Sequence, residues 1–378
     1  MFKNIVLFSL LILILICLII LIFKISKLIK YLKDKNGKKN LPEILITLGI
    51  STMAVGYVGG FDKVLLIIAL LLKRTDLDKI ANFNPIIFFS GIIILIIGIV
   101  TYYFRTDYMC ILNINAYSKL NLDKDNSIFK GKKVEEKEID IVDIYLNRFK
   151  PDYNSEYMKD ILRIVKNDVL AFKFESKGRK CGYTGIAPVP IVMYAGSFLD
   201  RIKIDEYIEF DNKCTKEHYL LNDNSEKYQK LKLFSDLNSI SKNFEEVVLA
   251  ISITNSIEDN QLIQFGNIPK IHLKIDKVGD NAIKSKKQLI EYVNLIIEYA
   301  EKISRLFPNL KRINLVCSAQ SCLALEIGRM CPEGTRISEI VCYQFEIKDT
   351  IKYPWGIVIN GDNSGDFINR KEVSKCTI

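Results

Sequence analysis

The chain has 378 residues, of which 49% are hydrophobic, and it carries a net charge of +9. This length is enough for two or three folding units, and the charge suits an anionic partner such as a phosphate ligand, a nucleic acid or a lipid headgroup. Two histidines and nine irregularly spaced cysteines argue against a histidine-based metal site, a Ser-His-Asp relay and a disulfide framework, so neither a metal nor a cofactor is expected.

Residues 1–104 are predicted to form a transmembrane region, because Ile, Leu, Val and Phe dominate this part of the chain. We expect three helices, over residues 5–23, 41–72 and 86–104. A signal peptide is the alternative interpretation of the first, but lysines follow it where a small-residue cleavage site would be needed.

The second apolar segment leaves the number of crossings open. Asp62 and Lys63 interrupt it, so it forms either one long, broken crossing or a crossing followed by a short re-entrant piece. Two, three or four crossings are therefore possible. The lysine-rich loop 24–40 should stay in the cytoplasm, and with three crossings everything after Arg105 is cytoplasmic as well. The expected localisation is the cell inner membrane, as a multi-pass protein with a soluble C-terminal domain in the cytoplasm.

Residues 105–139 are expected to be a connector, and residues 140–378 a cytoplasmic sensor domain. Within the latter, "VLAFKFE" at 169–175 alternates like a strand. A second strand should run to Gly185, followed by a turn at 186–187 and a helix over 191–199 that prolines help to open.

The second half of this domain repeats that order. Residues 247–253 are nearly all apolar, as in a strand covered on both faces. Ser285 and Gln288 have capping-box spacing ahead of an amphipathic helix. A strand at 313–317, a short turn, another helix and a strand at 337–346 follow. Strands that alternate with helices predict an α/β domain with a parallel sheet.

The turn "SAQS" (318–321) joins a buried strand to a helix. Parallel sheets bind ligands beyond the carboxyl ends of their strands, and a helix amino terminus favours an anion such as phosphate. The alternative is structural: Ser318 caps the helix, and the small residues only permit tight packing.

Three stretches together resemble the SAVED domain, a sensor found in bacterial cyclic-oligonucleotide-based anti-phage systems (CBASS). They are "YTGIAPVPIVMYAGSFL", "LAISITNS" and "INLVCSAQSCLALEIGRM…EIVCYQFE", with "AIKSKKQLIEYVNLIIEYAEKI" between the last two. The resemblance implies two CARF-like Rossmannoid halves around one pocket for a cyclic di- or trinucleotide. With the membrane segment, the chain looks like a SAVED effector with transmembrane helices (TM-SAVED).

The resemblance also implies which residues line the pocket, and none of them is expected to be catalytic. The expected ligand-binding residues are Tyr183, Gly185, Ala187, Pro188, Ser252, Thr254, Asn255, Ser256, Ser318, Ala319, Gln320 and Ser321. Tyr183 would either stack on a base or be a core tyrosine. Two turns depart from the family pattern: Pro188-Val189-Pro190 replaces a His-Ile-Pro turn, and Ser318-Ala319-Gln320 replaces a turn often built around proline. Both departures put the nucleobase preference in doubt.

The leading hypothesis is a sensor without catalytic activity. A cyclic oligonucleotide, not DNA, would bind the cytoplasmic domain and induce homo-oligomers, which would disrupt the lipid bilayer and cause abortive infection. The alternative is a membrane-anchored hydrolase or nuclease with a Rossmann-like core, for which Glu258 and Asp259 are the best candidate acids. A transporter is disfavoured by the few spans and the large soluble domain.

Overall fold

The computed structural model describes residues 41–56, 85–106 and 108–370, except 121, 123–126, 130–132, 201, 212, 224–226 and 332–335. The chain divides into two compact units, Met1–Thr106 and Asp107–Ile378. Each unit is described by itself.

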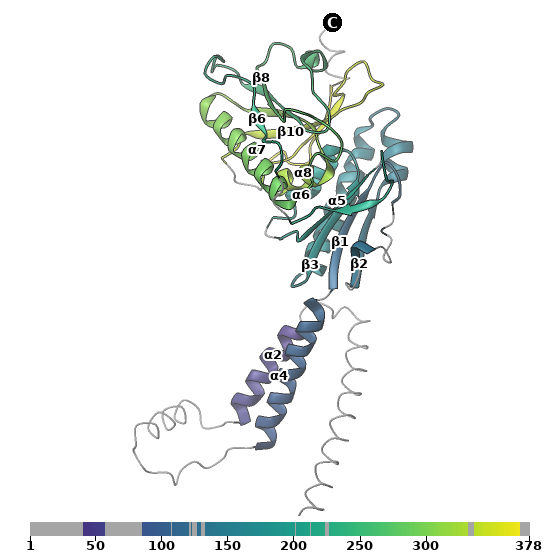
Figure 1. Cartoon of the computed structure of the whole chain (residues 1–378), viewed down its shortest axis with the longest axis vertical. Helices are drawn as coiled ribbons and strands as arrows, with labels where there is room; N and C mark the ends of the chain where they lie inside the picture. Colours follow the sequence, from purple (N-terminus) through teal and green to yellow (C-terminus); the bar gives the residue numbers. More distant parts are fainter. Residues whose placement is uncertain are drawn as a thin grey trace, which may run out of the picture. The chain divides into compact units, whose positions relative to one another are not determined.

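Two helices that pack along each other represent the first unit: α2 (Leu41–Gly56) and α4 (Pro85–Thr106) (Figure 1). Glycines allow their backbones to approach closely. A Cβ atom on Gly49 would lie 2.6 Å from the Leu95 backbone nitrogen, and one on Gly98 would lie 2.8 Å from that of Ile46.

The predicted multi-pass localisation in the inner membrane is wrong. Among the described residues, none of the helices combines the length and the apolar character that a bilayer crossing requires. Helix α2 ends after 16 residues, whereas a crossing takes about 20. The predicted helix 5–23 and the part of 41–72 beyond Gly56, with Asp62 and Lys63, lie outside the described residues.

Asp107–Ile378 is an α/β unit, as predicted, and it contains two sheets. The first sheet has the strand order β2-β1-β3-β4-β5. Its strands are β1 (Tyr108–Asn115), β2 (Lys133–Asp140), β3 (Lys180–Ile186), β4 (Glu206–Phe210) and β5 (His218–Leu220). All neighbours are parallel except β4 and β5. Strand β1 lies between β2 and β3 and is buried, so the stretch 105–139, expected to be a connector, contributes an inner strand of this sheet.

The second sheet has the order β12-β11-β10-β9-β7-β8-β6, and its inner strands β10, β9, β7 and β8 run parallel. Its strands are β6 (Lys232–Leu233), β7 (Glu246–Ser252), β8 (Lys270–Lys274), β9 (Arg312–Ser318), β10 (Glu339–Gln344), β11 (Trp355–Val358) and β12 (Phe367–Asn369). Six of the seven residues of β7 are buried, which confirms a strand covered on both faces.

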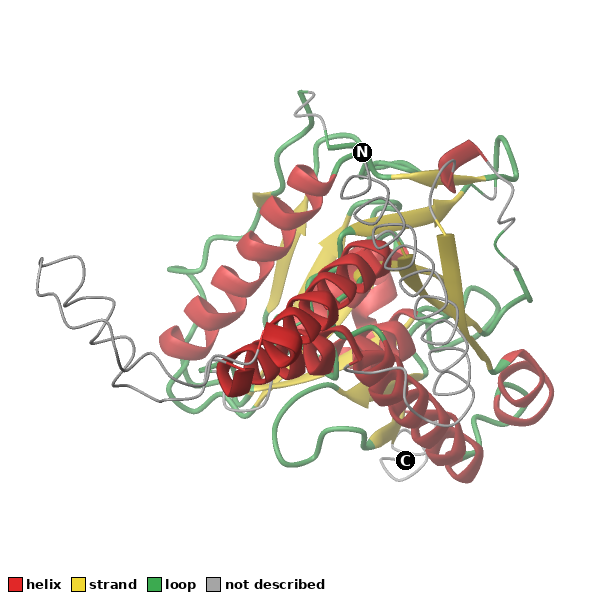
Figure 2. Ribbon diagram, turned by 90° about the horizontal axis from the view of Figure 1, so that it is seen from below, coloured by secondary structure: helices red, strands yellow, loops and turns green. Residues whose placement is uncertain are grey.

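Helices lie against the strands of both sheets (Figure 2). They are the π-helical η2 (Ile144–Phe149), α5 (Ser155–Glu175), α6 (Val189–Ser197), α7 (Lys286–Leu306) and α8 (Ser321–Arg329), with short 3-10 turns η1 (Ser127–Phe129) and η3 (Asp259–Phe265). As predicted, Ser285 is the N-cap of α7, and its hydroxyl accepts the Gln288 amide at 3.2 Å.

The predicted strand at 169–175 is wrong, because these residues are the end of helix α5. The Asn154 side chain caps the first turn, and Ile161, Val165, Val169 and Phe172 repeat at helical spacing on its buried face. The short window alternates because Leu170 and Phe174 are apolar residues on the exposed face, 41% and 59% accessible. The helical period appears only when the window extends back to Asn154.

Candidate functional site

The α/β unit has a first half, which contains the first sheet, and a second half, which contains the second sheet. In each half one strand leads through a turn into a helix: β3 into α6 in the first half, and β9 into α8 in the second. Helices α6 and α8 pack against each other through Gly196 and Gly328 (Figure 1). A Cβ atom on Gly328 would overlap the Met193 carbonyl oxygen, and one on Gly196 would overlap that of Leu325. The close contact brings the two strand–helix turns together.

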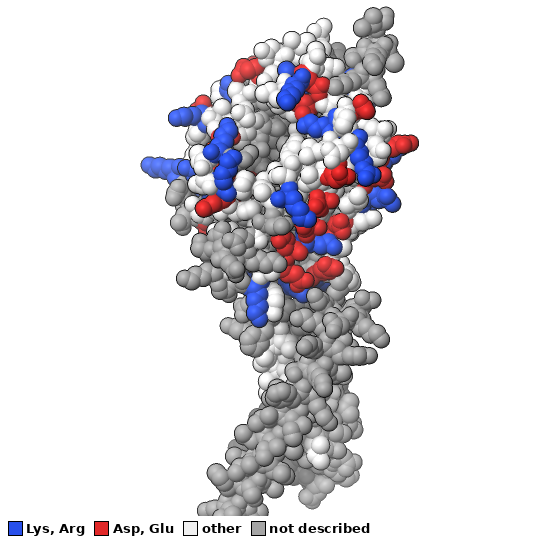
Figure 3. Space-filling model, turned by 90° about the vertical axis from the view of Figure 1, so that its right-hand side faces the viewer, with Lys and Arg blue, Asp and Glu red and all other residues white. Residues whose placement is uncertain are grey.

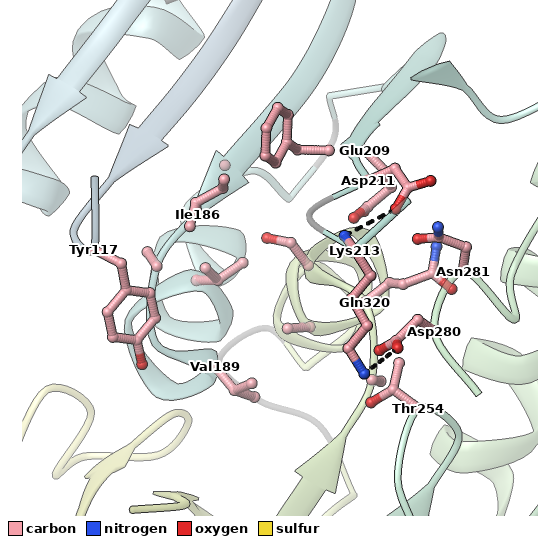
Figure 4. A pocket seen from close by; sticks show the side chains of 17 residues that line it. Tyr117, Ile186, Val189, Glu209, Asp211, Lys213, Thr254, Asp280, Asn281 and Gln320 are labelled. Carbon is pink, nitrogen blue, oxygen red and sulfur yellow. Dashed lines mark hydrogen bonds and ion pairs between the residues drawn. The ribbon is translucent and has the colours of Figure 1, made fainter. Parts of the chain in front are cut away.

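A cleft of about 280 Å³ opens between these turns, and about 910 Å³ when its mouth toward solvent is included. Known ligand pockets occupy roughly 300–1,000 Å³. The first half lines it with Tyr117, Gly185, Ile186, Ala187, Val189, Val192, Glu209, Phe210, Asp211 and Lys213 (Figure 4). The second half supplies Thr254, Asp280, Asn281, Ala319, Gln320, Ser321 and Ala324.

The cleft contains half of the ligand-binding residues expected from the sequence. Those that line it are Gly185, Ala187, Thr254, Ala319, Gln320 and Ser321. Those that do not are Tyr183, Pro188, Ser252, Asn255, Ser256 and Ser318. The predicted strand-end turns therefore lie at the cleft, and Tyr183, Pro188 and Ser252 are buried in the protein. Ligand binding by the residues that line the cleft stays a prediction.

Tyr183 is a core tyrosine and offers no face for base stacking. Its side chain is fully buried, and its hydroxyl lies 2.6 Å from the Ser321 hydroxyl. This bond joins β3 of the first half to the start of α8 in the second. Two aromatic residues do line the cleft: Phe210, at the end of β4, and Tyr117, which follows β1. The Tyr117 hydroxyl accepts a hydrogen bond from the Gln344 side-chain nitrogen at 3.1 Å.

The serines that end β7 and β9 hold the loop after β7 in place. The Ser318 hydroxyl lies 2.9 Å from that of Thr254 and accepts the Asn255 amide at 3.1 Å. The buried Ser252 hydroxyl accepts the Ile257 amide at 3.0 Å. Ser318 is also not the N-cap of α8, since that position belongs to Gln320.

The amino terminus of α8, where the sequence suggested a phosphate, already holds a carboxyl group of the protein. The carboxylate of Glu209, on β4, accepts the Cys322 backbone amide at 2.7 Å and is buried. Burial raises the pKa of this carboxyl, and hydrogen bonds from Cys322 oppose the shift. A ligand phosphate at this helix end would have to displace Glu209. The first turn of α8 is therefore not an open phosphate site.

Replacing Glu209 should alter the pH dependence of stability. Because its pKa in the fold is raised, its stabilising contribution is complete below the ordinary carboxyl value of 4.5 and is lost as the pH rises through the raised value. Glu209→Gln mimics the neutral acid, so we expect it to match the wild type near pH 4 and to be more stable at neutral pH. Urea unfolding from pH 4 to 8 measures the difference.

A second variant, Glu209→Ala, separates the effect of the charge of Glu209 from that of its hydrogen bond. Glu209→Ala leaves the Cys322 amide without its partner and should destabilise the protein by about 1–3 kcal/mol at every pH. A wild type that becomes more stable than Glu209→Gln as the pH rises would show that α8 stabilises the ionised carboxylate, contrary to this account.

Gln320 fixes the loop that forms the far wall of the cleft. Its side-chain oxygen accepts the Ile283 amide at 2.6 Å, and its side-chain nitrogen donates to the Ile283 carbonyl at 3.0 Å and to the Tyr219 hydroxyl at 3.1 Å. Tyr219 in turn donates to Asn281 at 3.0 Å. Gln320 therefore acts through the loop that it positions, and its amide is engaged within the protein.

The sequence analysis missed all four charged residues of the described lining, which are Glu209, Asp211, Lys213 and Asp280. Asp211 follows β4 and accepts the backbone amides of Lys213 at 3.1 Å and Cys214 at 3.0 Å. The hydrogen bond from the Cys214 backbone N–H holds the pKa of the Asp211 carboxyl below its usual range. An aspartate at the end of an alternating segment is a turn signal, so "EYIEFDNKCTKE" could have revealed this hairpin.

The lining residues that the structure describes include three acidic side chains, Glu209, Asp211 and Asp280, and one basic side chain, Lys213. Lys213 forms an ion pair with Asp280, which joins the turn after β4 to the loop after β8 (Figure 4). On the face shown in Figure 3, basic and acidic side chains are interspersed. The net charge of +9 therefore does not create a single-sign field on that face.

Three side chains outside the lining of the cleft, Arg179, Arg329 and Trp355, have partners within the protein. Arg179 donates to Glu135 at 2.6 Å, and Arg329 donates to the buried Glu326 at 2.6 Å. Trp355 is buried and packs edge-to-face on Phe149.

The two candidate acids lie outside the lining of the cleft. Glu258 caps η3, and Asp259 lies 3.1 Å from His272, a histidine remote from it in sequence. Among the described residues, no group of three or more His, Cys, Asp or Glu side chains is arranged to hold a metal ion.

Solved structures that match part of this chain include the Acinetobacter baumannii Cap4 SAVED/CARF-domain containing receptor with the cyclic trinucleotide 2′3′3′-cAAA (12% identity, TM-score 0.48) and with 3′3′3′-cAAA (14%, 0.47). Each match covers 75% of this chain and 59% or 60% of the receptor. The Moraxella osloensis Cap4 receptor is 15% identical with a TM-score of 0.39, and the match covers 63% of this chain and 47% of that one. The chain therefore spans 60% or less of the length of these receptors.

A comparison with curated protein sequences finds no match. The family model described as "SMODS-associated and fused to various effectors sensor domain" (SAVED) matches residues 166–359, from within α5 to just beyond β11. This is more than half of the chain, and it includes both strand–turn–helix elements that form the cleft. The chain therefore belongs to the SAVED family of sensor domains.

Proposed function

We propose that the Asp107–Ile378 unit is a CBASS-type sensor that binds a cyclic oligonucleotide in the cleft between its two halves. The observation that carries the proposal is the pairing of two strand–turn–helix elements, β3–α6 and β9–α8, around one opening. Open α/β sheets bind ligands beyond the carboxyl ends of their strands, and here two such ends meet. A ring-shaped ligand with repeated nucleotides suits a site built from two equivalent elements.

The lining supplies the groups that a nucleotide needs. Tyr117 presents an aromatic ring, Ala187 and Ala319 are small enough to let a ligand approach the backbone, and Thr254 and Lys213 provide polar contacts. Aromatic rings stack on bases, and cations pair with phosphates. Because about 280 Å³ is small for a cyclic oligonucleotide, part of the ligand would occupy the open mouth.

Ligand-induced association of the chain into homo-oligomers belongs to the same proposal. A ligand drives association only if it binds the associated state more tightly than the free chain. Light scattering with and without the ligand measures this step. The membrane-disrupting step predicted from the sequence depended on the multi-pass localisation, so the proposed function does not include it.

Titration of the full chain tests the binding function. Isothermal calorimetry with a panel of cyclic di- and trinucleotides, beginning with 3′3′3′-cAAA and 2′3′3′-cAAA, should detect one member with submicromolar affinity, about −8 kcal/mol or better. The linear trinucleotide of the same bases is the control and should bind more weakly, because its ends are not preorganised. Absence of binding by every cyclic member would refute the proposed function.

A further inference from the structure

The ion pair between Lys213 and Asp280 lies across the cleft and joins its two halves. Lys213 comes from the turn between β4 and β5, and Asp280 from the loop between β8 and α7 (Figure 4). Both side chains are exposed, by 69% and 41%, so neither is held by packing. The hydrogen bond to Asp280 raises the pKa of Lys213, which keeps the amine charged.

The other acidic groups of the cleft are already satisfied by backbone amides. Glu209 accepts the Cys322 amide, and Asp211 accepts the amides of residues 213–215. Asp280 depends on Lys213, which is the one basic side chain among the described lining residues. An anionic ligand that enters the cleft therefore meets a single ammonium group, and that group is occupied by Asp280.

The two loops stay connected when this ion pair is broken. Tyr219 on β5 donates to Asn281 at 3.0 Å, and the Asn222 and Lys286 amides donate to the carbonyls of Lys284 and Asn222, both at 3.0 Å. The ion pair lies at the exposed end of a connection that backbone bonds already secure. Exposed ion pairs contribute little to stability, so its residues can be replaced without loss of the fold.

We propose that Lys213 is the phosphate-binding residue of the cleft and that Asp280 competes with the ligand for it. This inference rests on the proposed function. Binding exchanges one charge-assisted contact, Lys213 with Asp280, for another, Lys213 with a ligand phosphate. The exchange sets a threshold, because the ligand binds only when its phosphate outcompetes the carboxylate. It also breaks this ion pair when the ligand arrives, while the hydrogen bonds between the two loops remain.

Three variants of the full chain test the exchange by calorimetry with each panel member that the wild type binds, 3′3′3′-cAAA first. Lys213→Met should weaken binding about 10- to 100-fold, the value of a charge-assisted hydrogen bond. Asp280→Asn should strengthen it about twofold to fivefold, because an exposed pair no longer competes. In the double variant, Asp280→Asn should change nothing further, because its effect passes through Lys213.

Asp276→Asn is the matched control, since it removes an equal charge from the same loop. Asp276 pairs with Lys232 at 2.7 Å, both residues are exposed, and neither lines the cleft. We expect unchanged affinity. Two results would overturn the exchange. One is an equal gain in affinity from Asp280→Asn and Asp276→Asn, and the other is a gain from Asp280→Asn that persists in the Lys213→Met background. Either would mean that Asp280 acts only by general repulsion of the ligand. If the wild type binds no panel member, the proposed function fails, and this inference fails with it.

Discussion

Gly328→Ala is expected to destabilise the protein by about 2–3 kcal/mol, the cost of overpacking a site that cannot relax. A loss of stability would be informative, because helix propensity alone predicts a gain: it favours alanine over glycine by about 1 kcal/mol within a helix. The added Cβ atom would overlap the Met193 carbonyl oxygen, which belongs to the backbone of α6 and cannot rotate away. Urea unfolding of the full chain measures the change.

The same substitution elsewhere provides the control. Gly279 lies in the loop after β8, and a Cβ atom there would meet nothing within 4 Å. Gly279→Ala should therefore change the unfolding free energy by less than about 0.5 kcal/mol. Because α6 and α8 both begin at the cleft, separating them should also weaken ligand binding. If Gly328→Ala proved as stable as the wild type, the two helices would not pack as closely as described.

The sequence predicted the elements whose signals are local. Strand β7 has an apolar run, α7 has Ser285 at its start, and β9, its turn and α8 follow each other within eighteen residues. The last turns of helix α5 carry a strand-like pattern, and its helical period is visible only over the whole of Ser155–Glu175. The two candidate turns were therefore located, and the side chains that point into the cleft from them were only partly identified.

The missed features depend on contacts between residues far apart in the sequence. Glu209 and Cys322 are 113 residues apart, and no local pattern indicates that a strand carboxylate will cap a helix of the other half. The hydroxyl contact between Tyr183 and Ser321 spans 138 residues in the same way. Both contacts became apparent only once the two halves were placed together.

Ala319→Trp is expected to abolish binding of the cyclic oligonucleotide, lowering affinity at least about 100-fold, or ~3 kcal/mol. Ala319 lines the cleft at the turn between β9 and α8 and is only partly buried. An indole there would fill much of a space of about 280 Å³, while the exposed mouth gives the side chain room without strain in the core. The unfolding midpoint should therefore stay close to that of the wild type, and calorimetry should show the loss of heat.

A side-by-side titration of wild type, Ala319→Trp and Ile263→Trp with the tightest-binding panel member tests the cleft most directly. Ile263 lies on η3, is 71% exposed and does not line the cleft, so its tryptophan adds equal bulk at an unrelated surface. We predict unchanged affinity in Ile263→Trp and no measurable binding in Ala319→Trp, with both variants folded. Wild-type affinity in a folded Ala319→Trp protein would contradict the account, because the ligand would then bind elsewhere.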